Sequence, residues 1–369
     1  MSDPRVEKLA DVLVNYSVGV KRGQKVGIQG SAVGEPLLKA IYVQVLKAGG
    51  YPLVLATLPG IDELFYRHAS DEQLQYIHEP IRMVTEKYDA IISLMSLDNT
   101  KALSNVSPAK MVLQQKAMKD LFQTFMQRSA RNELRWVGTL FPTKAHAQDA
   151  RMGTLEFEDF VYGACLPDQD DPIGYWKRFS AWQERIVSWL KGKKEVRVLG
   201  PETDLRVGIA GRPFINCDGQ KNMPDGEVFT GPIEDSVEGH VHYTYPAIYR
   251  GREVAGVRLW FEKGRVVKAT ADQNEDFLLE TIDADEGARR VGEFAIGTNK
   301  GVTRFTGSTL FDEKISGTFH MALGASIPES GGKNVSAVHW DMVCDLRQGG
   351  EIRVDGELLH KDGKFAIEF

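Results

Sequence analysis

Histidine and acidic residues with the spacing of metal ligands occur near the end of the 369-residue sequence. His320 is followed nineteen residues later by the triplet His339-Trp340-Asp341. Residues two apart in an extended strand project to the same face, so His339 and Asp341 can present a nitrogen and an oxygen to one ion. Imidazole and carboxylate ligands together suit zinc, cobalt or manganese. The pattern therefore predicts a divalent metal site.

Two glutamates lie in comparable surroundings upstream. Glu227 follows the turn-forming triplet Pro224-Asp225-Gly226, and a rigid turn can hold a carboxylate in place for a metal. Glu293 ends a short predicted helix, where the negative end of the helix dipole does not stabilise a carboxylate, so a cation would supply its partner. The alternatives are a solvated turn residue for Glu227 and an ion pair with Arg289 or Arg290 for Glu293.

His240 and His242 form a rival pair of ligands. They are separated by one residue in the strand predicted after Gly239, so they also share one face. Spacing alone does not choose between this pair and the pair His339 and Asp341.

The first half of the chain offers no comparable cluster. Gly27, Gly30 and Gly34 follow a predicted strand, but their spacing matches neither the dinucleotide fingerprint nor the Walker pattern. We interpret them as a structural turn, which disfavours a nucleotide-dependent oxidoreductase or transferase.

The elements that position these residues fall into two groups, so we expect domains at residues 1–190 and 191–369. In the first, apolar strands alternate with helices, which predicts an α/β scaffold with a Rossmann-like or flavodoxin-like parallel sheet. Its predicted strands are residues 25–30, 52–56, 90–95 and 134–138. A helix over 175–190 leads to shorter strands and hairpin turns such as residues 262–264. The second half is therefore predicted to be an α+β metal-binding catalytic domain with mainly antiparallel strands.

Charge and cysteine usage exclude several classes of protein. The 45 basic and 51 acidic residues give a net charge of -6, and no basic stripe is present that would bind nucleic acid. The N-terminus lacks the apolar run of a signal peptide, and no segment is apolar for long enough to span a membrane. Cys165, Cys217 and Cys344 form no CxxC pair. We therefore expect a cytoplasmic protein.

The same segments resemble the aminopeptidase T/aminopeptidase S family of metallo-aminopeptidases over essentially the whole chain. The most specific match runs from Gly211 to Thr230 and contains GRPFINCDG and NMPDGEVFT; a second match is the segment from Thr143 to Met152. The resemblance implies a homodimer and a site for two divalent ions (Zn, Co or Mn). The metal ligands that it implies are Glu227, Glu293, His320, His339 and Asp341. His240 and His242 have no counterpart in the family pattern.

The resemblance implies an aminopeptidase that removes N-terminal amino acids from peptides with a metal-activated water, and Glu227 or Glu293 would move the proton. One position departs from the family. Seven residues after His320, where the family usually has a tyrosine, this chain has Ile327. Loss of such a hydroxyl donor costs roughly 100-fold to 1000-fold in rate. The alternative is therefore a weak or inactive metal-binding or peptide-binding homologue, unless Tyr243, Tyr245 or Tyr249 replaces the donor.

Overall fold

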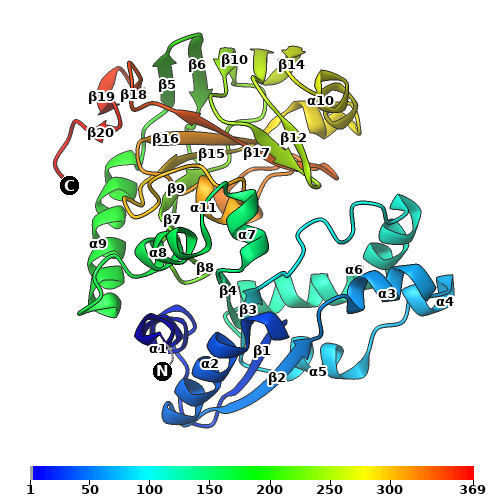
Figure 1. Cartoon of the computed structure of the whole chain (residues 1–369). Helices are drawn as coiled ribbons and strands as arrows, with labels where there is room; N and C mark the ends of the chain where they lie inside the picture. Colours follow the sequence, from blue (N-terminus) through cyan, green and yellow to red (C-terminus); the bar gives the residue numbers. More distant parts are fainter. Residues whose placement is uncertain (1–2) are drawn as a thin grey trace. The chain divides into compact units, whose positions relative to one another are not determined.

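The computed structural model describes residues 3–369 and separates into two compact units (Figure 1). The first unit contains the residues up to Tyr175 together with Gly219–Pro224, and the second contains Trp176–Asp218 and Asp225–Phe369. The boundary expected between residues 190 and 191 stays a prediction. Among residues 3–369, none of the helices combines the length and apolar character needed to cross a bilayer.

The first unit is built on a five-stranded parallel sheet in the order β2-β1-β3-β4-β8. This order is that of the flavodoxin-like doubly wound fold. The strands are β1 (Lys25–Ser31), β2 (Tyr51–Thr57), β3 (Ala90–Met95), β4 (Arg135–Leu140) and β8 (Asn222–Met223). The predicted α/β fold is confirmed. The fifth strand, β8, was not predicted, because it is short and comes from far along the chain.

Helices precede the first strand of this sheet and lie between the later ones. They are α1 (Pro4–Asp11), α2 (Glu35–Lys47), α3 (Ile61–His68), α4 (Asp71–Leu74), α5 (Glu79–Lys87), α6 (Pro108–Ala130), α7 (Lys144–Asp149) and α8 (Thr154–Cys165), with a π-helix at Val12–Ser17. Helix α1 begins where predicted, because the Asp3 side chain accepts a hydrogen bond from the Arg5 N–H and Pro4 occupies the first helical position.

The glycines of the first strand serve packing. A Cβ atom at Gly27 would lie 2.7 Å from Val84 Cγ1 of α5, and one at Gly30 would lie 2.8 Å from the Leu94 carbonyl oxygen of β3. These close approaches require glycine whether or not a ligand is present. They account for the glycine pattern without a phosphate site.

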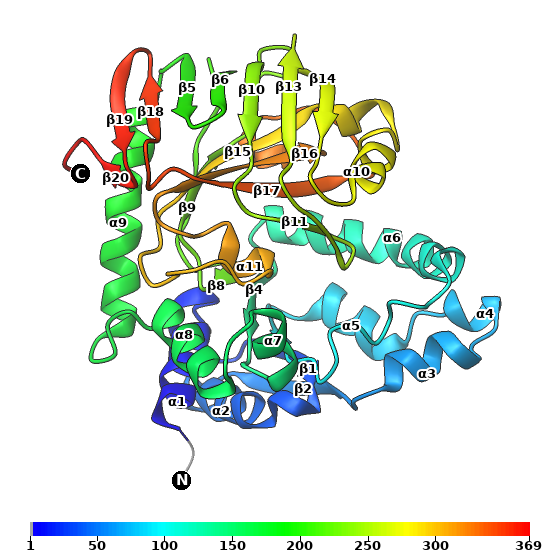
Figure 2. The ribbon, with the colours of Figure 1, turned by 45° about the horizontal axis from the view of Figure 1, so that its top comes forward.

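The second unit contains two larger antiparallel sheets and a β-hairpin (Figure 2). The eight-stranded sheet has the order β14-β13-β10-β6-β5-β18-β19-β20, and the five-stranded sheet has the order β17-β16-β15-β9-β7. The first consists of β5 (Glu195–Gly200), β6 (Thr203–Gly208), β10 (Glu238–His242), β13 (Arg258–Glu262), β14 (Arg265–Thr270), β18 (Glu351–Val354), β19 (Glu357–Lys361) and β20 (Lys364–Phe365). The second consists of β7 (Ile215–Cys217), β9 (Glu227–Thr230), β15 (Val291–Gly297), β16 (Thr318–Gly324) and β17 (His339–Asp345). The predicted antiparallel α+β character is confirmed.

One large apolar core holds this unit together, and several shorter elements complete it. They are β11 (Ala247–Tyr249), β12 (Arg252–Val254), α9 (Pro172–Leu190, whose first turn belongs to the first unit), α10 (Glu275–Ile282), α11 (Thr309–Asp312) and the 3-10 helices Glu286–Arg289 and Pro328–Ser330. Side chains of both sheets, such as Val198 and Phe319, belong to the same buried cluster. The five-stranded sheet therefore presents one face to the core and keeps the other for polar side chains.

Candidate metal centre

Strand alternation separates apolar and polar side chains of the five-stranded sheet. Phe319 and Met321 of β16 and Trp340 and Met342 of β17 belong to the apolar core cluster. Their neighbours His320, His339 and Asp341 therefore project to the opposite face. Antiparallel pairing places Ala322 opposite Asp341 and Gly324 opposite His339, so β16 and β17 bring the polar residues to one region.

Glu293 and Glu227 reach the same face through different local structures, a β-bulge and a turn. In β15, the register with β16 shifts between Val291 and Glu293, which marks a bulge, and Phe294 then returns to the core. Glu227 begins β9, directly after the predicted turn, and pairs with Gly297 of β15. Both glutamates are buried, with 5% and 4% exposure for Glu227 and Glu293, so neither is a solvated surface residue.

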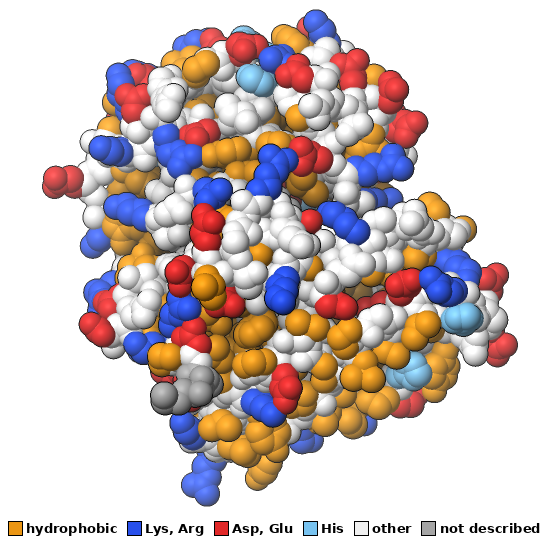
Figure 3. Space-filling model, viewed as in Figure 1, with side chains coloured by type: hydrophobic (Ala, Val, Ile, Leu, Met, Phe, Trp, Pro, Cys, Tyr) orange, Lys and Arg blue, Asp and Glu red, His pale blue; other side chains and the backbone are white. Residues whose placement is uncertain are grey.

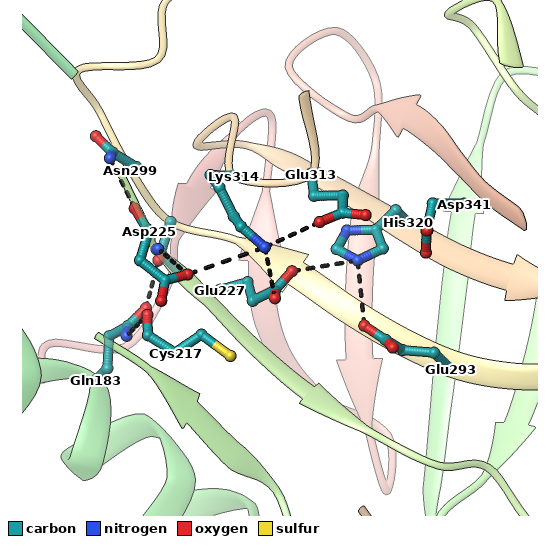
Figure 4. A network of polar contacts seen from close by, with 12 residues as sticks. Gln183, Cys217, Asp225, Glu227, Glu293, Asn299, Glu313, Lys314, His320 and Asp341 are labelled. Carbon is teal, nitrogen blue, oxygen red and sulfur yellow. Dashed lines mark hydrogen bonds and ion pairs between the residues drawn. The ribbon is translucent and has the colours of Figure 1, made fainter. Parts of the chain in front are cut away.

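The five predicted residues converge, and Figure 4 shows four of them, Glu227, Glu293, His320 and Asp341. His320 Nε2 lies 3.2 Å from Glu227 Oε2 and 3.4 Å from Glu293 Oε1. His339 Nε2 lies 3.8 Å from Glu293 Oε2 and 3.6 Å from Asp341 Oδ2. Glu293 thus directs one carboxylate oxygen toward each histidine. Glu227, Glu293 and His320 form one group of potential ligands, and Glu293, His339 and Asp341 form a second.

Several buried polar atoms of the cluster fit a metal ion. Glu227 Oε2, His320 Nε2 and Asp341 Oδ1 have no hydrogen-bond partner among residues 3–369. Leaving such atoms unsatisfied is costly, and a bound cation would satisfy them. His339 Nδ1 lies 2.8 Å from the Ala325 carbonyl oxygen, so in the neutral ring Nδ1 donates this bond and Nε2 is left for a metal. The donor set of imidazoles and carboxylates suits zinc, cobalt or manganese.

Burial and the neighbouring charges together shift the pKa values of the titratable groups in the cluster. Burial raises the pKa of the Glu227 carboxyl, although Lys314 and His320 act in the opposite direction. Burial also raises the pKa of Asp341 well above its usual range. Burial favours the neutral ring of His320, but Glu293 and Glu227 outweigh it and raise the pKa of His320 to about 9. At neutral pH the proton on His320 therefore occupies a position for which a divalent cation would compete.

Glu313 and Lys314 belong to the cluster and were missed by the sequence argument. Glu313, His320 and Asp341 form a further group of potential ligands. Lys314 Nζ lies 2.6 Å from Glu227 Oε1 and 2.9 Å from Glu313 Oε2. The two residues follow α11, in a segment with no ligand-like spacing. The only sequence signal was a run of three charged residues, Asp312 to Lys314, between the apolar residues Phe311 and Ile315.

The rival histidines lie elsewhere. His240 and His242 are in β10 of the eight-stranded sheet, where His242 Nδ1 lies 3.7 Å from Glu202. Among residues 3–369, neither belongs to a group of three potential ligands.

Two of the three tyrosines considered as replacements for the missing hydroxyl, Tyr245 and Tyr249, are engaged elsewhere, whereas the buried Tyr243 hydroxyl has no hydrogen-bond partner among residues 3–369. Tyr243 is buried in the apolar core, and the Tyr249 ring stacks on Trp340, on the core side of β17. The Tyr245 hydroxyl hydrogen-bonds to Asp345 and Arg347. These contacts place Tyr245 and Tyr249 outside the metal cluster.

Comparisons with known proteins agree with this site. The sequence model of the thermophilic metalloprotease (M29) family matches residues 2–365. Aminopeptidase 2 of Geobacillus stearothermophilus is 26% identical, over 98% of this chain and 95% of its own length. Aminopeptidase T of Thermus thermophilus is 27% identical, over 97% of this chain and 95% of its own length. The solved structure of wild-type AmpT from Thermus thermophilus has the same fold, with a TM-score of 0.85 at 24% identity and 99% of both chains covered.

The resemblance inferred from the sequence is confirmed by these matches, as is the predicted enzyme class, a hydrolase that depends on a metal. The family match extends over nearly all of both compact units. The chain is therefore a metallopeptidase and belongs to the thermophilic metalloprotease (M29) family.

Proposed function

We propose that this metallopeptidase is an aminopeptidase that removes N-terminal residues from peptides with the help of two divalent ions. The main support for the proposal is the position of Glu293. This residue belongs to two groups of potential ligands, and its two carboxylate oxygens face His320 and His339. The names of the relatives, which are aminopeptidases, support the reaction class.

Each ion would have its own ligands in this proposal. Glu227, Glu293 and His320 would hold one ion, and Glu293, His339 and Asp341 would hold the other. Glu313 is a further candidate ligand beside His320 and Asp341. When bound, the ions would lower the pKa of a water molecule and polarise the peptide carbonyl.

The protein's own residues would move the proton and hold the substrate. Glu227 or Glu293 would accept the proton of the water and return it to the leaving amine. A carboxylate of the cluster would hold the free amino group of the peptide, which would limit cleavage to the N-terminal bond. His339 has a side chain that is 35% exposed, so we expect the peptide to approach from its side of the cluster.

The test is the variant Glu293→Gln. It keeps the size of the side chain but removes the charge shared by both ligand groups, so hydrolysis of a leucyl chromogenic substrate in added zinc or cobalt should be almost abolished. The matched control is Glu280→Gln, at an exposed position on α10. Normal turnover in Glu293→Gln would refute the proposed role of this residue.

A weak or inactive metal-binding homologue is the second candidate, because Ile327 supplies no hydroxyl. Ile327 precedes the 3-10 helix Pro328–Ser330, and its carbonyl oxygen accepts hydrogen bonds from the N–H and the hydroxyl of Ser330. Purified protein that binds zinc or cobalt without releasing any amino acid from leucyl reporters would favour this candidate.

We also propose a homodimer in the cytoplasm. The edge strand β2 of the first unit has exposed apolar side chains, with Tyr51 66% and Val54 36% exposed, and apolar side chains gather over this unit in Figure 3. An uncovered edge strand is a template for pairing with a second copy. The three cysteines are free thiols, which suits a reducing compartment. Light scattering of the wild type and Val54→Lys would test the dimer, because the added charge should yield monomers.

A further inference from the structure

A lysine is almost completely buried among the proposed metal ligands. The Lys314 side chain is 1% exposed. Its ammonium contacts Glu227 and Glu313 and lies 3.9 Å from Asp225 Oδ1 (Figure 4). A charged amine is tolerated at such a position only when carboxylates neutralise it.

Backbone hydrogen bonds hold Lys314 at this position in the chain. The Lys314 N–H donates to the Phe311 carbonyl, and the Lys314 carbonyl accepts from the Asn299 N–H, both at 2.9 Å. The Asn299 side chain in turn donates to the Asp225 carbonyl at 2.7 Å. The lysine and the turn that precedes Glu227 are therefore tied to the same asparagine.

The contacts divide the Glu227 carboxylate between two partners. Oε1 is 2.6 Å from Lys314 Nζ, whereas Oε2 faces His320 at 3.2 Å and makes no hydrogen bond. An oxygen held by the ammonium is less available as a second metal ligand, so this arrangement favours a single metal contact from Glu227. Groups behind the ligands set their orientation and strength in this way at many metal sites.

We propose that Lys314 is a positioning residue that stabilises the metal-free site at the expense of metal affinity. This inference rests on the proposed metal centre. Without metal, the ammonium balances carboxylates that would otherwise repel one another in a buried space. With metal bound, the same positive charge repels the cations. Lys314 therefore lowers the difference in stability between the metal-free and the metal-loaded protein.

The experiment compares the wild type with Lys314→Met, which keeps most of the side-chain length and removes the charge. After chelation, the variant should melt about 10 °C below the metal-free wild type, as expected for a broken buried ion pair. Zinc should raise its Tm by more than it raises the Tm of the wild type. Calorimetric titration should show zinc affinity that is higher by about tenfold, within the usual range of coupling between two sites.

Arg212→Met is the matched control, because Arg212 is a largely buried cation paired with Glu234 at 2.7 Å in the same unit. It should lower the Tm of the metal-free and zinc-loaded forms equally and leave zinc affinity unchanged. An equal or smaller zinc effect in Lys314→Met than in the wild type would overturn the inference, as would failure of this variant to fold in saturating zinc. Absence of any zinc effect on the wild type would refute the metal centre itself, and the inference with it.

Discussion

The two units each contain a five-stranded sheet, and the two sheets differ in what their faces carry. In the parallel sheet of the first unit, four of the six residues of β3 are buried apolar side chains: Ala90, Ile91, Ile92 and Leu94. In the antiparallel sheet of the second unit, residues of the apolar core flank His320 in β16 and alternate with His339 and Asp341 in β17. A strand that is buried by apolar contacts on both sides offers no room for polar chemistry. A sheet with one face on the core leaves the other face available.

The largest effect is expected from a substitution at the metal centre of the second unit. His320→Ala removes an imidazole that contributes to two groups of potential ligands, so kcat/KM for a leucyl substrate should fall by about 1000-fold or more. Zinc content after dialysis, measured by atomic emission, should fall in parallel. The corresponding change in the first unit, His68→Ala on the exposed side of α3, should alter neither quantity. Equal losses in both variants would contradict the assignment of chemistry to the second unit.

The next prediction concerns position 327, where this chain has an isoleucine instead of the tyrosine that the family usually has. Ile327→Tyr supplies a donor of the kind that the family usually has, and kcat should rise by about 100-fold if the hydroxyl reaches the scissile carbonyl. Ile327→Phe adds a similar ring without the hydroxyl and is the control. If both variants show the same turnover, position 327 contributes no donor to the reaction.

A smaller effect is expected from packing in the first unit. Gly30→Ala should lower the free energy of unfolding by about 1–3 kcal/mol, because its Cβ atom would lie 2.8 Å from the Leu94 carbonyl oxygen. The zinc-induced rise in Tm should not change. Gly138→Ala, on β4 of the same sheet, should be almost neutral in urea unfolding, because its Cβ atom would lie 3.7 Å from the nearest atom, Asn222 Oδ1. Loss of zinc binding in Gly30→Ala would show that this sheet does more than support the fold.

The last prediction concerns the pH dependence of stability and compares two buried histidines of the second unit. Carboxylates raise the pKa of His320, whereas burial lowers the pKa of His360 to about 4. The unfolded chain binds a proton at position 360 below about pH 6.5, while the folded protein stays neutral there until about pH 4. The contribution of His360 to stability is therefore complete above pH 6.5 and is lost as the pH falls toward 4, by at most about 1.4 kcal/mol per pH unit.

Urea unfolding of the wild type and His360→Leu at several pH values between 4 and 7 would measure this contribution. The variant should depend less steeply on pH, by about one proton. Parallel pH profiles for the two proteins would mean that His360 is protonated in the folded state as readily as in the unfolded chain.

Local patterns in the sequence were sufficient to predict much of the fold. The four apolar strands of the first unit, the start of α1 at Asp3 and Pro4, and the antiparallel nature of the second unit all depend on periodicity, capping and turn residues. The short strand β8 could not be predicted in this way. Its two residues gain their partners only when Asn222 and Met223 lie beside Gly138 and Thr139 of β4.

For the site, the chain by itself determined which side chains have metal-ligand chemistry. Same-face spacing connected His339 with Asp341, and residue context made Glu227, Glu293 and His320 candidates. The family resemblance then selected these five over the rival pair His240 and His242. Only the tertiary structure decided that Glu293 faces both histidines, because this depends on a bulge and on the register of three strands. It also decided that Glu313 and Lys314 enter the cluster. Burial turns an ordinary charged pair of residues into an ion-pair network, and burial of a loop residue depends on contacts between segments that are distant in the chain.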